Sequence, residues 1–239
     1  MRVSVLSVVS LSAGLASGAW AEITTDTFDA GSNTGGWTYG GPFGSVLATG
    51  GNPGAYWNEP DIDTFAPRLR TTNLTSAFTG DYRTREVSRL GVDLALFHVD
   101  FSAAGRPLSL ILLSDNETPG NPNDDWGAYT MHAQNIPLVG QGWLRYDFGV
   151  PSQATSLPAG WTFIEFGAGA NPNWNSLITS VAGVEFFYGN PENFFIFQMW
   201  HVGADNVTIE TVPAPGAAVL LAAVTLGIQR RRTRSVLAP

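Results

Sequence analysis

Several aromatic residues lie in segments rich in asparagine, aspartate and glycine, where they could bind sugars. These segments are Tyr56-Trp57-Asn58, Asp125-Trp126 and 171–175, the last of which contains Trp174. An exposed aromatic ring stacks on the apolar face of a sugar, while neighbouring amides and carboxylates bind its hydroxyl groups. Because functional side chains are often carried on loops, Tyr56, Trp57, Trp126 and Trp174 are predicted to form a carbohydrate-binding surface. The alternative is that each ring is buried beneath its loop.

The chain offers few groups for catalysis. It contains no Cys and no Lys, which excludes thiol nucleophiles, disulfides and lysine Schiff bases. Its three His residues stand apart, without the spacing of a metal site. Residues 59–63 are similar to the Glu-x-Asp-x-x-Glu strand of jelly-roll glucanases, but the final Glu is missing and Pro60 has no N–H for a central strand. A turn or edge segment explains Glu59 and Asp61 better, so no catalytic residue is assigned and no enzyme is expected.

The net charge of the chain indicates which classes of partner it can bind. Seven arginines and all 20 acidic residues lie between residues 22 and 211, a net charge of −13 before any histidine is protonated. Binding to phosphate needs the opposite sign, so this charge argues against nucleic acid or an anionic membrane as a partner. An acidic excess of this size suits solubility or divalent cations.

Apolar residues and turn residues together predict the fold. Residues 92–101 and 108–113 are strand-like and predict a hairpin. Further strand-like segments lie at 129–133, 143–150, 161–167, 181–188, 194–200 and 206–211, with a short helix expected at 174–179. Trp143, Trp161 and Trp200 have strand-like neighbours and are predicted to be core residues. The pattern predicts one all-β domain over residues 22–211, a β-sandwich of jelly-roll type.

The first 21 residues have the pattern of a signal peptide. Arg2 gives a positive start, residues 3–16 are apolar, and Ala19-Trp20-Ala21 fits the small-x-small rule for cleavage. The mature chain is therefore expected to begin near Glu22, and the protein is expected to be exported.

The last segment, 212–239, combines prolines, an apolar run and an arginine cluster. Val212-Pro213-Ala214-Pro215 is followed by the apolar residues 217–228 and by arginines at 230–234. A full membrane span takes ~20 residues, so a run of this length is a marginal anchor. Arginines after the run hold the extreme end on the cytoplasmic side. We therefore predict that the tail stops temporarily in the membrane, where a processing enzyme can cleave it. A lipid-anchor signal is the alternative, but such signals end in apolar residues and this tail carries an arginine cluster after its apolar run.

This tail resembles the sorting signal of the PEP-CTERM family of bacterial exported proteins. The resemblance covers Val212, Pro213 and Pro215, the apolar run, and Arg230, Arg231 and Arg232, although Ala214 replaces the usual Glu of the family. It implies a membrane transpeptidase of the exosortase type as partner, and the cell surface or extracellular matrix as destination.

The central domain resembles carbohydrate-binding jelly rolls and laminin IV type A-like domains. The resemblance rests on short motifs: 27–29, 35–37, 50–56, 80–83 and 204–209. It implies a jelly-roll fold and a structural Ca²⁺ where the first and last strands meet, held by Asp29 and Asp205, with Asp26 as a third carboxylate. The alternative is that these aspartates only form local hydrogen bonds in turns.

Three functions follow, from different classes. The first is a non-catalytic sandwich that binds extracellular polysaccharide, and the second is a structural surface or matrix protein without a ligand. The third, a jelly-roll glycosidase, depends on Glu59 and Asp61 alone. Glycan binding by the mature domain distinguishes the first two, and release of reducing ends identifies the third.

Overall fold

The computed structural model describes residues 21–212. The predicted signal peptide and sorting tail, with Pro213, Pro215, Arg230, Arg231 and Arg232, lie outside the described residues except for Ala21 and Val212. Between residues 21 and 212, no helix is long and apolar enough to cross a membrane.

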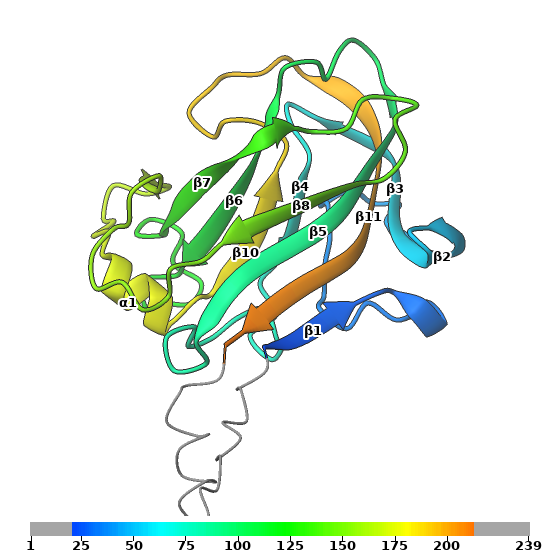
Figure 1. Ribbon diagram of the computed structural model, residues 1–239. Helices are drawn as coiled ribbons and strands as arrows, with labels where there is room; N and C mark the ends of the chain where they lie inside the picture. Colours follow the sequence, from blue (N-terminus) through cyan, green and yellow to red (C-terminus); the bar gives the residue numbers. More distant parts are fainter. Residues whose placement is uncertain (1–20, 213–239) are drawn as a thin grey trace, which may run out of the picture. The chain divides into compact units, whose positions relative to one another are not determined.

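The described residues form eleven strands, one short α-helix and one turn of 3-10 helix (Figure 1). The strands are β1 (Glu22–Asp26), β2 (Ser45–Gly51), β3 (Gly54–Thr64), β4 (Arg68–Thr71), β5 (Val87–Val99), β6 (Pro107–Ser114), β7 (Trp126–Asn135), β8 (Leu144–Gly149), β9 (Thr162–Glu165), β10 (Gly183–Phe187) and β11 (Gln198–Thr211). The 3-10 turn spans Asp29–Gly31, and the helix α1 spans Trp174–Thr179, where the sequence predicts it. Asn173 caps this helix by accepting a hydrogen bond from the backbone N–H of Ser176, 3.1 Å away.

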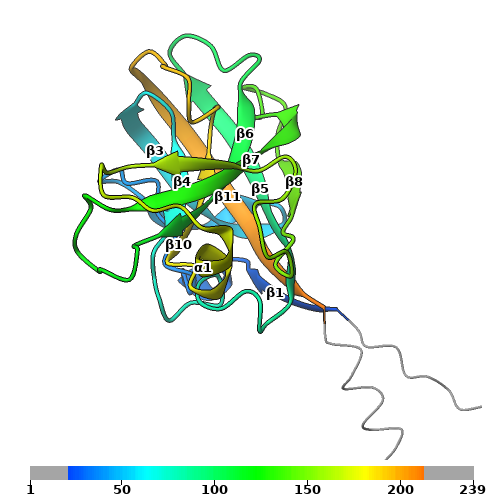
Figure 2. The ribbon, with the colours of Figure 1, turned by 90° about the vertical axis from the view of Figure 1, so that its left-hand side faces the viewer.

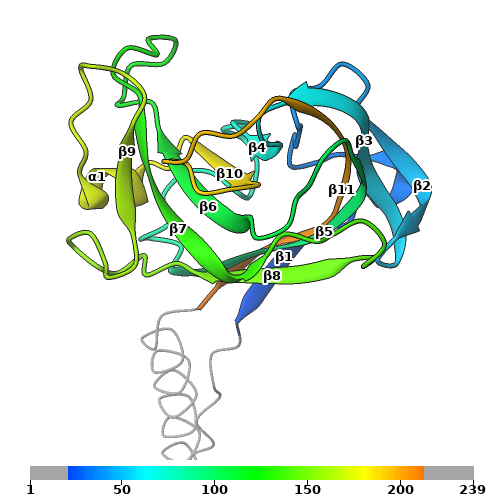
Figure 3. The same ribbon diagram turned by 90° about the horizontal axis from the view of Figure 1, so that it is seen from above.

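The strands make two antiparallel sheets that face each other (Figure 3). The first sheet has the order β2-β3-β11-β5-β8, with β1 paired to the last part of β11. The second sheet has the order β4-β10-β6-β7-β9. The prediction of an all-β sandwich is confirmed. The predicted hairpin of 92–101 with 108–113 is wrong, because β5 belongs to the first sheet and β6 to the second.

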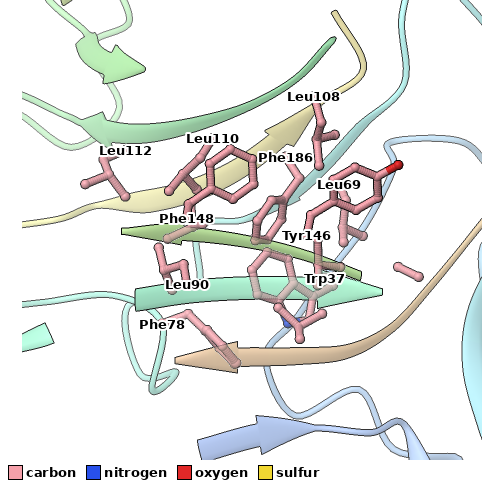
Figure 4. Close-up of a cluster of buried hydrophobic side chains, with 14 of the residues drawn as sticks. Trp37, Leu69, Phe78, Leu90, Leu108, Leu110, Leu112, Tyr146, Phe148 and Phe186 are labelled. Carbon is pink, nitrogen blue, oxygen red and sulfur yellow. The ribbon is translucent and has the colours of Figure 1, made fainter. Parts of the chain in front are cut away.

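A core rich in aromatic rings fills the space between the sheets (Figure 4). Trp37 lies against Phe78 and Phe186, with ring centroids 5.0 and 6.0 Å apart. The large buried rings also bring polar atoms, and the hydroxyls of Tyr39 and Tyr188 satisfy each other at 2.9 Å. Strands β5 and β6 each supply leucines to this core from opposite sheets, and the chain crosses between the sheets after β5.

Strand β3 contains Pro60, and its pairing shows how the strand tolerates a proline. Pairing with β2 ends at Asn58, so the stretch after Asn58 pairs only with β11. The register with β11 shifts between Trp200 and Val202, so that Pro60 and Asp61 form a bulge in β3 opposite His201. A proline at a bulge beside a free edge removes no ladder hydrogen bond. The prediction of an edge segment at 59–63 is thus confirmed, although a strand continues through it.

The two ends of the described chain lie side by side, because β1 pairs with the end of β11 from Glu22 opposite Thr211 to Asp26 opposite Val207 (Figure 2). The loops that follow β3 and β5, and the loop that precedes β11, gather at the opposite end of the sandwich (Figure 1).

Candidate functional site

Two of the four aromatic rings predicted to bind sugar are buried. Trp126 and Trp174 are each 1% exposed. Trp126 begins β7 and packs edge-on against Phe163 at 5.8 Å, and Trp174 begins α1 and packs against Trp161 at 5.0 Å. The expectation of exposed loop rings is wrong here, because each tryptophan is the first residue of an element that packs on the core, and its polar neighbours are the preceding loop.

The other two rings, Tyr56 and Trp57, are consecutive residues of β3 and so point to opposite faces of the first sheet. Trp57 faces inward, packs against the core and lies 6.4 Å from Phe28. Tyr56 faces outward. Neither residue is in a loop, and of the four predicted rings only Tyr56 belongs to an outer surface.

Tyr56 is part of an aromatic cluster on the outer face of the first sheet, which we call the outer cluster: Tyr56, Phe97, Trp143 and His201. The ring of Tyr56 lies 5.3 Å from that of Trp143 and 5.8 Å from that of Phe97, and Phe97 lies 4.8 Å from His201. Phe97 is 37% exposed and Trp143 and His201 are half-buried, whereas Tyr56 is 7% exposed. The prediction that Trp143 belongs to the core is wrong.

Gly203 of β11 forms the floor beneath these rings. A Cβ atom at Gly203 would lie 2.8 Å from Phe97, 3.0 Å from Trp143 and 3.1 Å from Tyr56. Ala95 of β5 lies beside Gly203 in the sheet. Small residues at these two positions let the rings settle against the backbone of the sheet. The rings come from β3, β5 and β11 and from the residue before β8, so only the sheet brings them together.

Polar groups border the outer cluster. Asn58 is buried, and its Oδ1 accepts hydrogen bonds from the Nε2 of His201 at 2.8 Å and from the hydroxyl of Tyr56 at 3.3 Å. Burial lowers the pKa of His201 and raises the pKa of Tyr56, so both side chains are neutral at pH 7. A neutral imidazole that donates to Asn58 leaves its other nitrogen as an acceptor.

The turn between β2 and β3 bends over the same face. Nδ2 of Asn52, in this turn, donates to the carboxylate of Asp93 on β5 at 3.1 Å. Asp93 also accepts from Nδ2 of Asn206 at 2.8 Å and forms an ion pair with Arg145 at 3.4 Å. Arg145 donates in addition to the backbone carbonyl of Asn206 at 2.8 Å. The outer face therefore continues from aromatic rings into a network of amide, carboxylate and guanidinium groups.

The predicted Ca²⁺ ligands, Asp29 and Asp205, both lie beside this turn but are held by backbone N–H groups. Asp205 accepts from Asn52 at 2.5 Å and from Asn206 at 2.7 Å, and Asp29 accepts from Ala55 at 3.4 Å. Over residues 21–212, no three His, Asp or Glu side chains are grouped so that they could hold a metal ion. Ca²⁺ takes six to eight oxygen ligands, so a site at Asp29 and Asp205 needs backbone carbonyls or waters to complete its shell.

Asp26 does not join these two aspartates. Its carboxylate accepts from the backbone N–H groups of Phe28 at 3.4 Å and Gly35 at 2.7 Å, and it shapes the loop after β1. This is the role that the alternative explanation gives to such aspartates. The environment of Asp205 disfavours its charged form. Burial, and then the charges of Asp93 and Asp29, raise its pKa to about 6 despite the two backbone hydrogen bonds.

Glu59 points into the edge of the core. It is fully buried, its Oε1 accepts from the backbone N–H of Phe43 at 3.3 Å, and its Oε2 has no partner among the described residues. Burial is the main cause of its raised pKa, and the charge of Asp61 adds to it. Gly41 and Gly44 lie so close to this carboxyl group that a Cβ atom at either position would overlap it. The backbone at Gly41 and Gly44 thus lies against this carboxyl group.

Comparisons with known proteins identify no family. No protein-family model matches the chain, and no curated protein sequence matches it. Among solved structures, it is similar to a chain from a structural analysis of an exo-β-agarase, with 14% identity and a TM-score of 0.41 over 79% of this chain and 24% of that one. It is also similar to the L4b domain of human laminin α-2, with 10% identity and a TM-score of 0.35 over 82% of this chain and 100% of that domain. Both likenesses are distant, and this chain spans about a quarter of the agarase chain.

Proposed function

We propose that this protein is exported to the cell surface or extracellular matrix, where its jelly-roll sandwich binds a neutral polysaccharide chain without cleaving it. The observation that supports this most strongly is the outer cluster, in which Phe97, Trp143 and His201 are partly exposed around the small residue Gly203. An aromatic surface on one face of a sheet, rather than in loops, is the proposed binding site.

The chemistry of the outer cluster suits a sugar. The rings of Phe97 and Trp143 offer apolar surface to the C–H face of a pyranose, and His201 and the Arg145–Asp93 network offer acceptors and donors for its hydroxyls. One stacked ring contributes about 0.5–1.5 kcal/mol beyond the area that it buries. With few rings available, dissociation constants nearer millimolar than nanomolar are expected.

The charge of the domain favours a neutral polysaccharide over an anionic one. Residues 22–211 carry a net charge of −13. Arg145 is the one arginine in the network, and it already pairs with Asp93 and Asp147. An acidic glycan would meet repulsion that a neutral glycan avoids.

Export and sorting are part of the proposal and rest on the sequence. Residues 1–21 direct export, and the tail, with Val212, Pro213, Pro215, Arg230, Arg231 and Arg232, is the substrate of an exosortase-type membrane transpeptidase. The membrane is then a transient partner, and the extracellular polysaccharide is the lasting one.

Affinity electrophoresis tests the binding site. The full chain is run through gels that contain a neutral glucan, galactan or mannan, beside the variants Trp143→Ala and Phe97→Ala. Each variant should lose about 2- to 10-fold in affinity, the range that one stacked ring supplies. Phe194→Ala is the matched control, because Phe194 is 89% exposed and lies away from the outer cluster, in the loop before β11. Equal retention of all three variants, or no retention of the parent chain in any gel, contradicts the proposal.

The enzyme alternative is tested with the same polysaccharides. Glu59 is enclosed by Gly41, Gly44 and Phe43, which argues against a role for its carboxyl group in hydrolysis. We therefore expect no new reducing ends after prolonged incubation. Reducing ends that disappear in the Glu59→Gln variant would show a glycosidase instead.

A further inference from the structure

A cavity of about 410 Å³ lies on the outer face of the second sheet, on the side of the sandwich opposite the outer cluster. We call it the second-sheet pocket. Arg70 of β4, Glu185 of β10 and Leu113 of β6 line it from the sheet, and the loop 115–125 and Phe166 line it from above. Its volume is within the usual range of small-ligand sites.

Two charged side chains in the pocket are wholly or partly buried. Glu185 is 4% exposed. The Nε of Arg70 is buried and has no hydrogen-bond partner in the described part of the chain. A buried polar atom without a partner is unfavourable, and a ligand that supplies hydrogen bonds removes the penalty.

The arrangement of charge selects a neutral ligand. Arg68 and Arg70 contribute two positive charges, and Glu185, Asp115 and Asp125 contribute three negative ones. Arg70 and Glu185 are direct cross-strand partners, so donors and acceptors alternate instead of gathering at opposite ends. The excess of one negative charge repels an anion. A zwitterion needs a positive region and a negative region apart from each other, and the alternating charges do not provide them. Hydroxyl groups both donate and accept, and they can satisfy alternating groups.

Apolar side chains supply the other half of sugar recognition. Leu113 is part of the lining on the sheet side, while Leu74 and Phe166 line the pocket with exposed side chains. An aromatic or aliphatic surface beside hydroxyl-binding groups is the combination that a pyranose ring requires.

A second hollow continues from the first. It also measures about 410 Å³, shares Ser114 and Asp115 with the second-sheet pocket, and is lined further by amides and hydroxyls: Asn116, Asn171, Asn173, Asn175, Ser176 and Ser180. The segments beside Trp126 and Trp174 thus line the two hollows, although their indole rings are buried.

We infer that the second-sheet pocket is a separate glycan site that takes one or two sugar units from the end of a neutral chain. A pocket walled by the loop 115–125 suits a chain end, whereas the outer cluster suits the middle of a chain. The two sites lie on opposite faces of the sandwich, so one molecule would bridge two polysaccharide chains. The bridging rests on the proposed function, but the pocket does not.

Saturation-transfer NMR tests the pocket directly. The probes are the methyl glycosides and β-linked disaccharides of glucose, galactose and mannose, with glycine, acetate and phosphate as charged competitors. Glu185→Gln keeps the shape of the side chain, and Arg70→Met removes the guanidinium group; each should weaken sugar binding at least threefold. Arg89→Met is the matched control, since Arg89 lies outside the pocket and pairs with Glu210 at 3.5 Å. Circular dichroism checks that each variant is folded. If Arg70→Met does not fold, Glu185→Gln alone tests the pocket.

The results separate this inference from the proposed function. Sugar binding that falls in Glu185→Gln but not in Trp143→Ala supports the pocket, even if the outer cluster fails. Binding that is equal in Glu185→Gln, Arg70→Met and Arg89→Met overturns it, as does stronger binding of glycine or acetate than of any sugar. Light scattering with a long neutral polysaccharide tests bridging, which both Trp143→Ala and Glu185→Gln should reduce. Scattering equal to that of the parent chain in either variant overturns the bridging.

Discussion

The indole Nε1 of Trp143 donates a hydrogen bond to the backbone carbonyl of Gly50, 3.0 Å away, across the outer face of the first sheet. Trp143 precedes β8, at one edge of that sheet, and Gly50 is in β2, at the other edge. The bond is made because the β2–β3 turn bends over the sheet, where Asn52 also meets Asp93 and Asp205. This contact holds the ring of Trp143 over Gly203 and so shapes the proposed binding surface.

Gly203→Ala should open the outer cluster. The new Cβ atom would lie 2.8 Å from the ring of Phe97, and this ring is exposed enough to swing outward. Overpacking costs 1–3 kcal/mol where nothing can move, so we expect about 1 kcal/mol or less of lost stability together with weaker polysaccharide binding. Urea denaturation and affinity electrophoresis measure the two effects. Gly149→Ala is the control, because a Cβ atom there meets nothing within 4 Å; a Gly203→Ala chain that binds like this control contradicts the proposed site.

Trp174→Ala should lower the stability of the domain, and its effect should not be confined to polysaccharide binding. The ring is fully enclosed and packs against Trp161 at 5.0 Å. Removal of a buried tryptophan costs about 3–5 kcal/mol, while removal of the exposed Phe194 should change stability by less than about 0.5 kcal/mol. Denaturation by urea distinguishes the two variants. A Trp174→Ala chain as stable as Phe194→Ala would show that the ring is not a core residue.

The sequence predicts the sandwich because apolar residues recur along short segments between turns, as in Val92–Phe101, and this pattern depends on local residues alone. It does not predict which strands pair, and β5 and β6 separate because each finds its partners far along the chain: β5 pairs with β11 and β8, and β6 pairs with β10 and β7. Tyr56 alternates with Trp57, which indicates that one of the two faces outward. The positions of Phe97 and His201 around Gly203 require the register of three strands, and no local pattern contains that register.

Asp205 should make the protein less stable as pH rises from about 4 to about 6. Burial, with the charges of Asp93 and Asp29, raises the pKa of Asp205 from 3.8 to about 6 in the folded state. Between these values the folded state holds a proton that the unfolded state has lost, so the free energy of unfolding falls with pH and levels off above about 6. The free energy of unfolding, measured at several pH values for the parent chain and for Asp205→Asn, isolates this effect. The free energy of unfolding of the parent minus that of Asp205→Asn should become lower from about pH 4 to about pH 6. A value that stays constant or rises over this interval contradicts the shift in pKa.

Calcium is a separate question for the same aspartate. If Asp29 and Asp205 hold Ca²⁺, as the resemblance to jelly rolls implies, binding to the folded state alone adds about 2.7 kcal/mol at a hundredfold excess over Kd. The melting temperature of the full chain should then rise by several degrees between chelator and millimolar Ca²⁺ at pH 7.5. The rise should vanish in Asp205→Ala. Superimposable melting curves would show that the backbone N–H groups of Asn52, Asn206 and Ala55 are the only partners these carboxylates need.

The sorting tail predicts a shorter protein at the cell surface. Processing after about Pro215 removes the apolar run 217–228 and the arginines beyond it, so the intact mass of the envelope-associated protein should correspond to a chain that begins near Glu22 and ends near Pro215. The arginines should set the stop in the membrane, because moving four guanidinium groups through the bilayer is strongly unfavourable. Replacement of Arg230, Arg231, Arg232 and Arg234 by Ser should therefore send an uncleaved chain into the medium. Replacement of the exposed Arg89 by Ser leaves the tail intact and should leave processing unchanged. A surface protein whose mass includes Pro239 would show that the tail is not a processing signal.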